Sequence, residues 1–161
     1  MPQTFSQSQH TAAQATARQA PEQAPKQASE PTPDLAQVDR DFLAKLSATD
    51  FGPIAFKLMN PEEGEPWSLT RATQAIEQYR RFLFLSKHYP NHRIVPSREV
   101  DQVWHMHILD TAKYREDCDT LFGKFMDHWP YFGMKDAAER EELNEAFSDT
   151  QTLMEAHFGK A

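Results

Sequence analysis

Glycine and cysteine are scarce in this chain, and long apolar runs are missing from it. Its 161 residues include five glycines and one cysteine, Cys118. No glycine-rich loop precedes a helix start, so a phosphate or nucleotide site has little support. A lone cysteine has no partner for an internal disulfide, which favours a cytoplasmic location. No run of about eighteen apolar residues occurs, and we therefore expect no membrane-spanning segment.

Basic residues are also in short supply. The 17 Lys and Arg residues are outnumbered by 24 Asp and Glu residues, which gives an acidic chain with a net charge of −7. An acidic protein repels the phosphate backbone of nucleic acids, and no stripe of Lys and Arg offsets that repulsion. We therefore expect no nucleic acid among its partners.

Residues 1–33 differ in composition from the rest of the chain. Gln, Ala, Ser and Pro dominate them, and bulky aliphatic side chains are almost missing. Such a segment buries too little apolar surface to offset its chain entropy, so it is predicted to be a disordered tail. Residues 34–161 have the length and composition of a single folded domain.

This domain shows helical periodicity and no strand pattern. Apolar side chains recur every three or four positions in the segments 34–46, 69–89, 98–122 and 136–158, and a short apolar segment lies at 50–59. Ser97 and Asp136 are expected to cap two of these helices, and Gly123 to end one. The sequence predicts an all-α bundle of about five helices. The helix of residues 98–122 should be central, because its apolar arc covers about half of its circumference.

That helix contains the tetrapeptide WHMH, with two histidines two residues apart. At about 100° per residue, the rings of His105 and His107 point roughly 200° apart, so they cannot share one metal ion on an unbroken helix. Each has a carboxylate at helical contact distance, Asp101 for His105 and Asp110 for His107. A carboxylate on one ring nitrogen fixes the tautomer and leaves the other nitrogen free. We expect both rings to be buried.

A third histidine has a route to this helix. His128 follows Gly123, where the chain can fold back, so Asp101, His105 and His128 would make a set of two histidines and one carboxylate. That set is typical of non-haem iron sites. The segment 128–133, HWPYFG, is otherwise interpreted as a packed aromatic turn that covers the bundle.

A small-ligand pocket around the same helix is the second expectation. Its expected lining is His105, His107, Asp110, Tyr114 and Trp104. The competing interpretation is that the histidines are only satisfied polar groups of the core, because buried imidazoles need partners in any case.

The same stretch resembles a known family. The strings that carry the resemblance are VDQVWHMHILDTAKYREDC and LFGKFMDHWPYFG, and they resemble the signature of the glycine-rich domain-containing protein-like family. The resemblance covers about residues 35–135 and implies a helical domain like that of compact members without the glycine-rich region. It implies no catalytic residue. A function in RNA binding is not carried over, because this chain has neither a glycine-rich tract nor an RNA-binding module.

Two functions remain as alternatives. The first is binding of a small ligand or of a metal ion, Fe or Zn, at the His/Asp-lined centre, and whether the protein is an enzyme is left open. The second is a protein–protein interaction module, in which the histidines are structural and the acidic bundle and the tail contact a partner protein.

Overall fold

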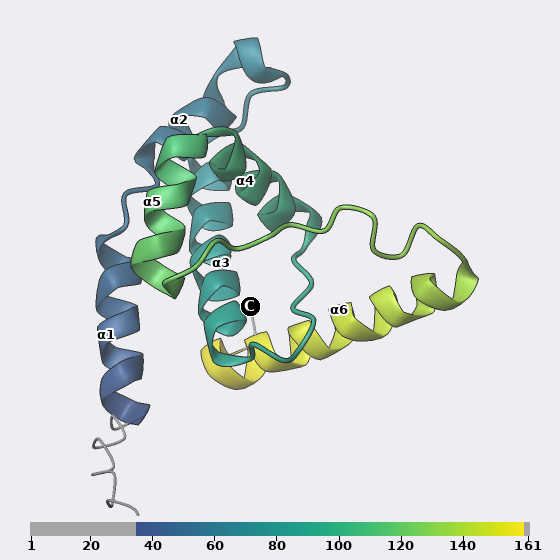
Figure 1. Cartoon of the computed structure of the whole chain (residues 1–161). Helices are drawn as coiled ribbons and strands as arrows, with labels where there is room; N and C mark the ends of the chain where they lie inside the picture. Colours follow the sequence, from purple (N-terminus) through teal and green to yellow (C-terminus); the bar gives the residue numbers. More distant parts are fainter. Residues whose placement is uncertain (1–34, 160–161) are drawn as a thin grey trace, which may run out of the picture. The chain divides into compact units, whose positions relative to one another are not determined.

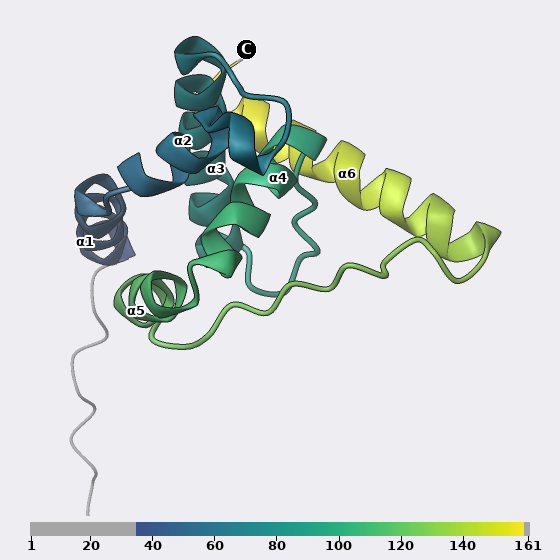
Figure 2. The same ribbon diagram turned by 90° about the horizontal axis from the view of Figure 1, so that it is seen from above.

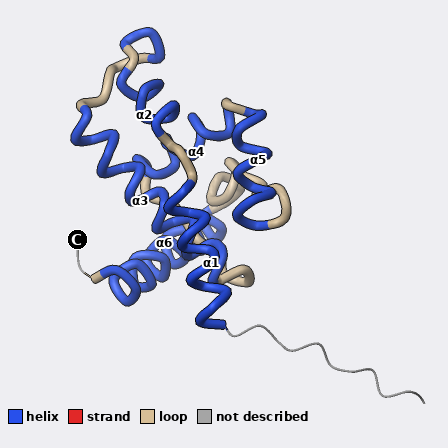
Figure 3. Tube along the Cα trace, turned by 90° about the vertical axis from the view of Figure 1, so that its left-hand side faces the viewer, coloured by secondary structure: helices blue, strands red, loops and turns tan. Residues whose placement is uncertain are grey.

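A computed structural model describes residues 35–159, which fold into helices and connecting loops without a strand (Figure 3). This confirms the all-α class, whereas the predicted tail at residues 1–33 lies outside the described residues. The elements within this range are α1 (Leu35–Ala48), α2 (Gly52–Met59), a short 3-10 helix η1 (Pro61–Glu63), α3 (Leu69–His88), α4 (Arg98–Leu109), α5 (Thr111–Phe122) and α6 (Ala137–Phe158). None of these helices is long and apolar enough to cross a lipid bilayer.

Side-chain caps set where the long helices begin. The Ser68 hydroxyl accepts a hydrogen bond from the backbone N–H of Arg71 at the start of α3. The predicted caps at Ser97 and Asp136 are confirmed, since each accepts from a backbone N–H three residues later, at 3.3 Å and 2.9 Å. Each cap satisfies one of the donors that a helix start leaves unpaired, so α4 and α6 begin at defined residues.

The prediction of one helix over residues 98–122 is wrong. Two helices of 12 residues each, α4 and α5, meet at Asp110. The backbone there has φ −82° and ψ 71°, outside the helical region, and the Asp110 N–H donates to the carbonyl of His107. Because the chain changes direction at this point, α5 contacts α1 as well as α4 (Figure 1). Side chains after Asp110 therefore do not lie where a continuous helix would place them.

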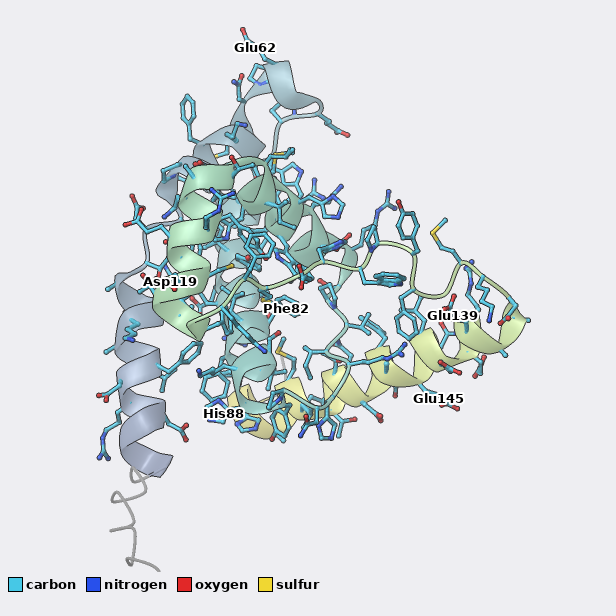
Figure 4. The ribbon with its side chains drawn as sticks, in the orientation of Figure 1. Glu62, Phe82, His88, Asp119, Glu139 and Glu145 are labelled. Atoms are coloured by element: carbon cyan, nitrogen blue, oxygen red, sulfur yellow. The ribbon has the colours of Figure 1, made fainter. Side chains whose placement is uncertain are left out.

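Helix α3 supplies the largest share of the core. Its buried side chains are Ala72, Ala75, Tyr79, Phe82, Leu83, Phe84 and Leu85. Phe82 packs against Trp104 with ring centroids 5.0 Å apart, and it lies inside the bundle while Glu62 and Glu145 project outward (Figure 4). The predicted central position of α4 is confirmed, because α4 packs against α2, α3 and α5 (Figure 2).

The connection from α5 to α6 has no regular secondary structure. Gly123, with φ 68°, ends α5 as predicted. Gly133 has φ 83°, and a Cβ there would lie 2.6 Å from Cδ2 of Leu143 on α6. Only glycine fits both this backbone conformation and this close approach, so Gly133 lets the connection pack tightly on α6.

Candidate metal centre

Asp101 and His105 stand one turn apart on α4, on the same face of the helix. Their closest atoms, Asp101 Oδ2 and His105 Nε2, are 3.6 Å apart. The two side chains are 39% and 51% exposed. The expectation that the His105 ring is buried is therefore wrong. This exposure leaves the imidazole accessible to an ion or a ligand from solvent.

The third member of the cluster comes from the connection between α5 and α6. His128 Nε2 lies 3.0 Å from Asp101 Oδ1, and the His128 ring lies edge to face against His105 with centroids 4.7 Å apart. Asp101, His105 and His128 each offer one ligand atom, and these three atoms lie within 4.8 Å of one another. Ligand atoms around an ion at about 2.1 Å are separated by roughly 3 Å, so closing the set requires mainly a shift of the exposed His105 ring.

Backbone contacts hold the segment that carries His128. On one side, the Tyr114 hydroxyl donates to the carbonyl of Met126. On the other side, the Gly133 N–H donates to Glu139 at 3.1 Å, and the Gly133 carbonyl accepts from Arg140 Nε at 3.0 Å. His128 thus lies between two anchored points, although its segment has no secondary structure.

His107, two residues from His105, has entirely different surroundings. It is 2% exposed, and both of its ring nitrogens have partners. Nδ1 lies 3.0 Å from the Tyr79 hydroxyl, and Nε2 lies 2.9 Å from Asp117 Oδ2. A carboxylate can only accept, so Nε2 carries the proton and Nδ1 accepts from the tyrosine. The predicted pairing of His107 with Asp110 is wrong, because the break after α4 brings Asp117 of α5 to the ring instead.

Burial keeps this imidazole neutral. It lowers the pKa of His107, an effect that the Asp117 carboxylate partly offsets by favouring the charged ring. Burial also raises the pKa of the Tyr79 hydroxyl well above its usual value, so this hydroxyl stays protonated and able to donate. No ring nitrogen of His107 is left for a ligand, and the arrangement is that of a satisfied core histidine.

Trp104 and Tyr114 form a second buried pair. The indole Nε1–H donates to the Tyr114 oxygen at 2.9 Å, and the Tyr114 hydroxyl in turn donates a hydrogen bond to the carbonyl of Met126. Burial raises the pKa of Tyr114 and of the Cys118 thiol, which disfavours a thiolate nucleophile. The structure thus gives Tyr114 a role in positioning the His128 segment. The ligand pocket expected at His105, His107, Asp110, Tyr114 and Trp104 stays a prediction.

A cavity of about 810 Å³ opens beside the three-residue cluster. Its lining includes Asp101, Trp104, His105 and His128. The aromatic turn at residues 128–133 does not cover the bundle as expected, because Trp129 and Tyr131 are 72% and 64% exposed.

Comparisons with known proteins identify a family model and two curated relatives that match this chain. A family model described as UCP032817-like matches residues 49–150, which include the whole three-residue cluster. Glycine-rich domain-containing protein 2 of Arabidopsis thaliana is 30% identical over 91 residues, covering 54% of this chain and 11% of the plant protein. Glycine-rich domain-containing protein 1 of the same plant is 31% identical over 90 residues, covering 53% and 11%. No solved structure matches the chain.

These matches confirm the resemblance read from the sequence. The chain spans only about a tenth of the length of these two curated relatives, namely 11% of each. The similarity therefore concerns one helical region of much longer proteins.

Proposed function

The chain belongs to the UCP032817-like family, and we propose that its helical domain binds one divalent transition-metal ion, Fe or Zn, through Asp101, His105 and His128. The observation that carries the proposal is the meeting of these three side chains, which come from α4 and from a segment more than twenty residues later in the chain. Two imidazoles and one carboxylate on one face are a donor set that suits Fe(II) and Zn(II).

The surroundings of the cluster support this role. Three protein ligands leave open positions on an ion for water or a small ligand, which is the arrangement of metal sites that act on substrates. The ring of His128 has contacts on two sides, a 3.0 Å contact with Asp101 and a T-shaped contact with Trp104 with ring centroids 4.5 Å apart. Fixed ligand orientation lowers the entropy lost on metal binding.

Metal analysis of the full chain, purified without a histidine tag, tests the proposal. We expect about one Fe or Zn per chain in the native protein and almost none in His105→Ala. His92→Ala is the matched control, since His92 is also exposed and its ring contacts Tyr89 at 5.4 Å, while its backbone hydrogen bond to the Tyr89 carbonyl is kept in the variant. Absence of bound metal from the native protein, or retention of metal by His105→Ala, would contradict the proposal.

A protein–protein interaction module is the second candidate. The exposed aromatic side chains Trp129 and Tyr131, together with Met134, favour it, because large exposed apolar groups on one segment are a common feature of interfaces. The same metal analysis separates the two functions, since a purely structural cluster predicts no bound ion in the native protein or in either variant.

A further inference from the structure

The cavity beside the candidate metal centre has a chemically mixed lining. Its apolar part includes Ile94, Val95, Phe132 and Leu143. Its basic residues are Arg93 and Arg98, and its acidic residues are Asp101, Asp127 and Glu139. Such a lining suits a small molecule with a hydrocarbon body and charged ends.

Arg98 lies on the same face of α4 as two of the candidate metal ligands. Arg98, Asp101 and His105 follow a spacing of three and four residues, which places them in one row along the helix. The Arg98 side chain has no hydrogen bond or ion pair with any other described residue. Arg98 and His105 line both this cavity and a second one of about 610 Å³. Asp101 and His128 line the first cavity and not the second. A free guanidinium therefore stands one helical turn from Asp101.

The charge of the lining depends on the metal. Two arginines and three acidic residues line the cavity, so without an ion the lining carries one net negative charge when the histidines are neutral. A divalent cation reverses this to one net positive charge. One of the three carboxylates, Glu139, is already occupied by the backbone N–H groups of Gly133 and Lys135, at 3.1 Å and 2.9 Å. An anion is consequently attracted to this cavity only when the metal is present.

We propose that the cavity binds a small organic dicarboxylate, with one carboxylate on the metal held by Asp101, His105 and His128 and the other paired with the guanidinium of Arg98. The inference rests on the metal site proposed above. A guanidinium pairs with a carboxylate through two parallel hydrogen bonds, and an open metal position accepts the second carboxylate. The apolar lining contacts the methylene groups between them, which favours a dicarboxylate over inorganic phosphate.

Calorimetric titration of the full chain with glutarate tests this inference. The protein is first stripped of metal and reloaded with Co²⁺, whose absorption spectrum, recorded before any anion is added, reports binding to the imidazoles. We expect glutarate to bind the Co²⁺ form and not the metal-free form. Butyrate, which has one carboxylate fewer, and inorganic phosphate should each bind about tenfold more weakly or worse, because a charge-assisted pair is missing or the apolar contacts are lost.

Substitution of Arg98 tests dicarboxylate binding separately from metal binding. In Arg98→Gln we expect glutarate affinity to fall about tenfold, to the level of butyrate, while the Co²⁺ spectrum is unchanged. Arg115→Gln, an exposed arginine of α5 outside this cavity, is the matched control and should leave glutarate binding unchanged.

Four outcomes would overturn the inference, and they have three different meanings. Equal binding of glutarate and butyrate to the Co²⁺ form, or an unchanged affinity in Arg98→Gln, would refute the dicarboxylate and leave the metal site intact. Tighter binding of phosphate than of glutarate would identify an inorganic anion site instead. Failure of the native protein to bind Co²⁺ would remove the metal site and the dicarboxylate together.

Discussion

His105 and His107 are two residues apart on α4, yet one is 51% exposed and the other 2% exposed. His107 has a hydroxyl on one nitrogen and a carboxylate on the other, so its hydrogen bonds are complete within the protein. His105 has one carboxylate at 3.6 Å and a second imidazole beside it. Two histidines of one motif therefore need not share a role. One ring stabilises the core, and the other is available for chemistry.

The largest effect expected from this contrast is on stability. His107→Ala removes the partner of the buried Tyr79 hydroxyl and one partner of Asp117, and it leaves space in the core. We expect a loss of about 3 kcal/mol in the free energy of unfolding. Urea denaturation in the presence of EDTA measures this value without a contribution from bound metal.

His105→Ala is the matched variant for that measurement. Its ring is half exposed, so we expect a change of no more than about 0.5 kcal/mol. Equal losses of unfolding free energy in the two variants would contradict the different roles assigned to the two histidines.

A smaller effect on stability is expected at Tyr114, which connects the buried core to the segment that carries His128. Tyr114 accepts from the buried indole of Trp104 and donates to Met126, two residues before His128. Tyr114→Phe should lower the free energy of unfolding by about 1–2 kcal/mol, because a buried donor and a carbonyl lose their partner. It should also weaken metal binding several-fold, since the His128 segment is then anchored on one side only.

Tyr131→Phe provides the control, because its side chain is 64% exposed. We expect neither stability nor metal affinity to change in this variant. Metal titration followed by thermal unfolding would measure both quantities. Unchanged metal affinity in Tyr114→Phe would mean that the buried pair and the cluster are independent.

The smallest expected effect is the pH dependence of the free energy of unfolding that comes from His107. Burial holds the pKa of His107 below its ordinary value, with Lys113 acting in the same direction and the carboxylates of Asp117 and Asp110 against it. The unfolded chain therefore binds more protons at this residue as the pH falls below about 6.5. The contribution of the neutral, buried His107 ring to stability is fully present above that pH. It is lost as the pH falls toward the lower folded pKa, by less than about 1.4 kcal/mol per pH unit.

The difference between the native protein and His107→Ala isolates this contribution. Urea denaturation between pH 7.5 and pH 5, about the unfolded pKa of a histidine, should show a steeper loss for the native protein. A native slope no steeper than that of His107→Ala would mean that the buried ring accepts a proton without cost.

Much of the fold follows from local sequence signals. Ser97 and Asp136 cap the helices that they were expected to cap, because a hydroxyl or carboxylate before an amphipathic segment accepts from the helix start. The meeting of Asp101, His105 and His128 was also within reach of the sequence. Helical spacing places the first two on one face, and Gly123 allows the chain to return.

The surroundings of His107 were not predictable in the same way. No proline or glycine marks the break at Asp110, and an aspartate also occurs inside α4 at position 101. Without the break, Asp117 would lie ten residues along the same helix from His107, about 15 Å away. Its contact with the ring depends on tertiary packing of α5, which no local pattern encodes. The periodicity that indicates one long helix is equally compatible with two short ones.

The exposure of the aromatic turn was missed for a related reason. Trp129 and Tyr131 are apolar enough to suggest a packed turn, yet the segment is held through its backbone and not through these side chains. Composition predicts which residues favour burial. It does not show that a neighbouring element is available to cover them.

Main-chain anchoring has a consequence for redesign of this protein. The segment that carries His128 is fastened through the carbonyl of residue 126 and through the N–H and carbonyl of residue 133. Every residue type except proline offers these groups, so within the segment the anchoring hydrogen bonds fix no side chain, and Gly133 is required by its backbone conformation and its close approach to α6. The exposed side chains at positions 129, 131 and 134 can thus be exchanged for others without loss of the backbone contacts. Such exchanges would change the surface beside the His128 imidazole while its position is kept.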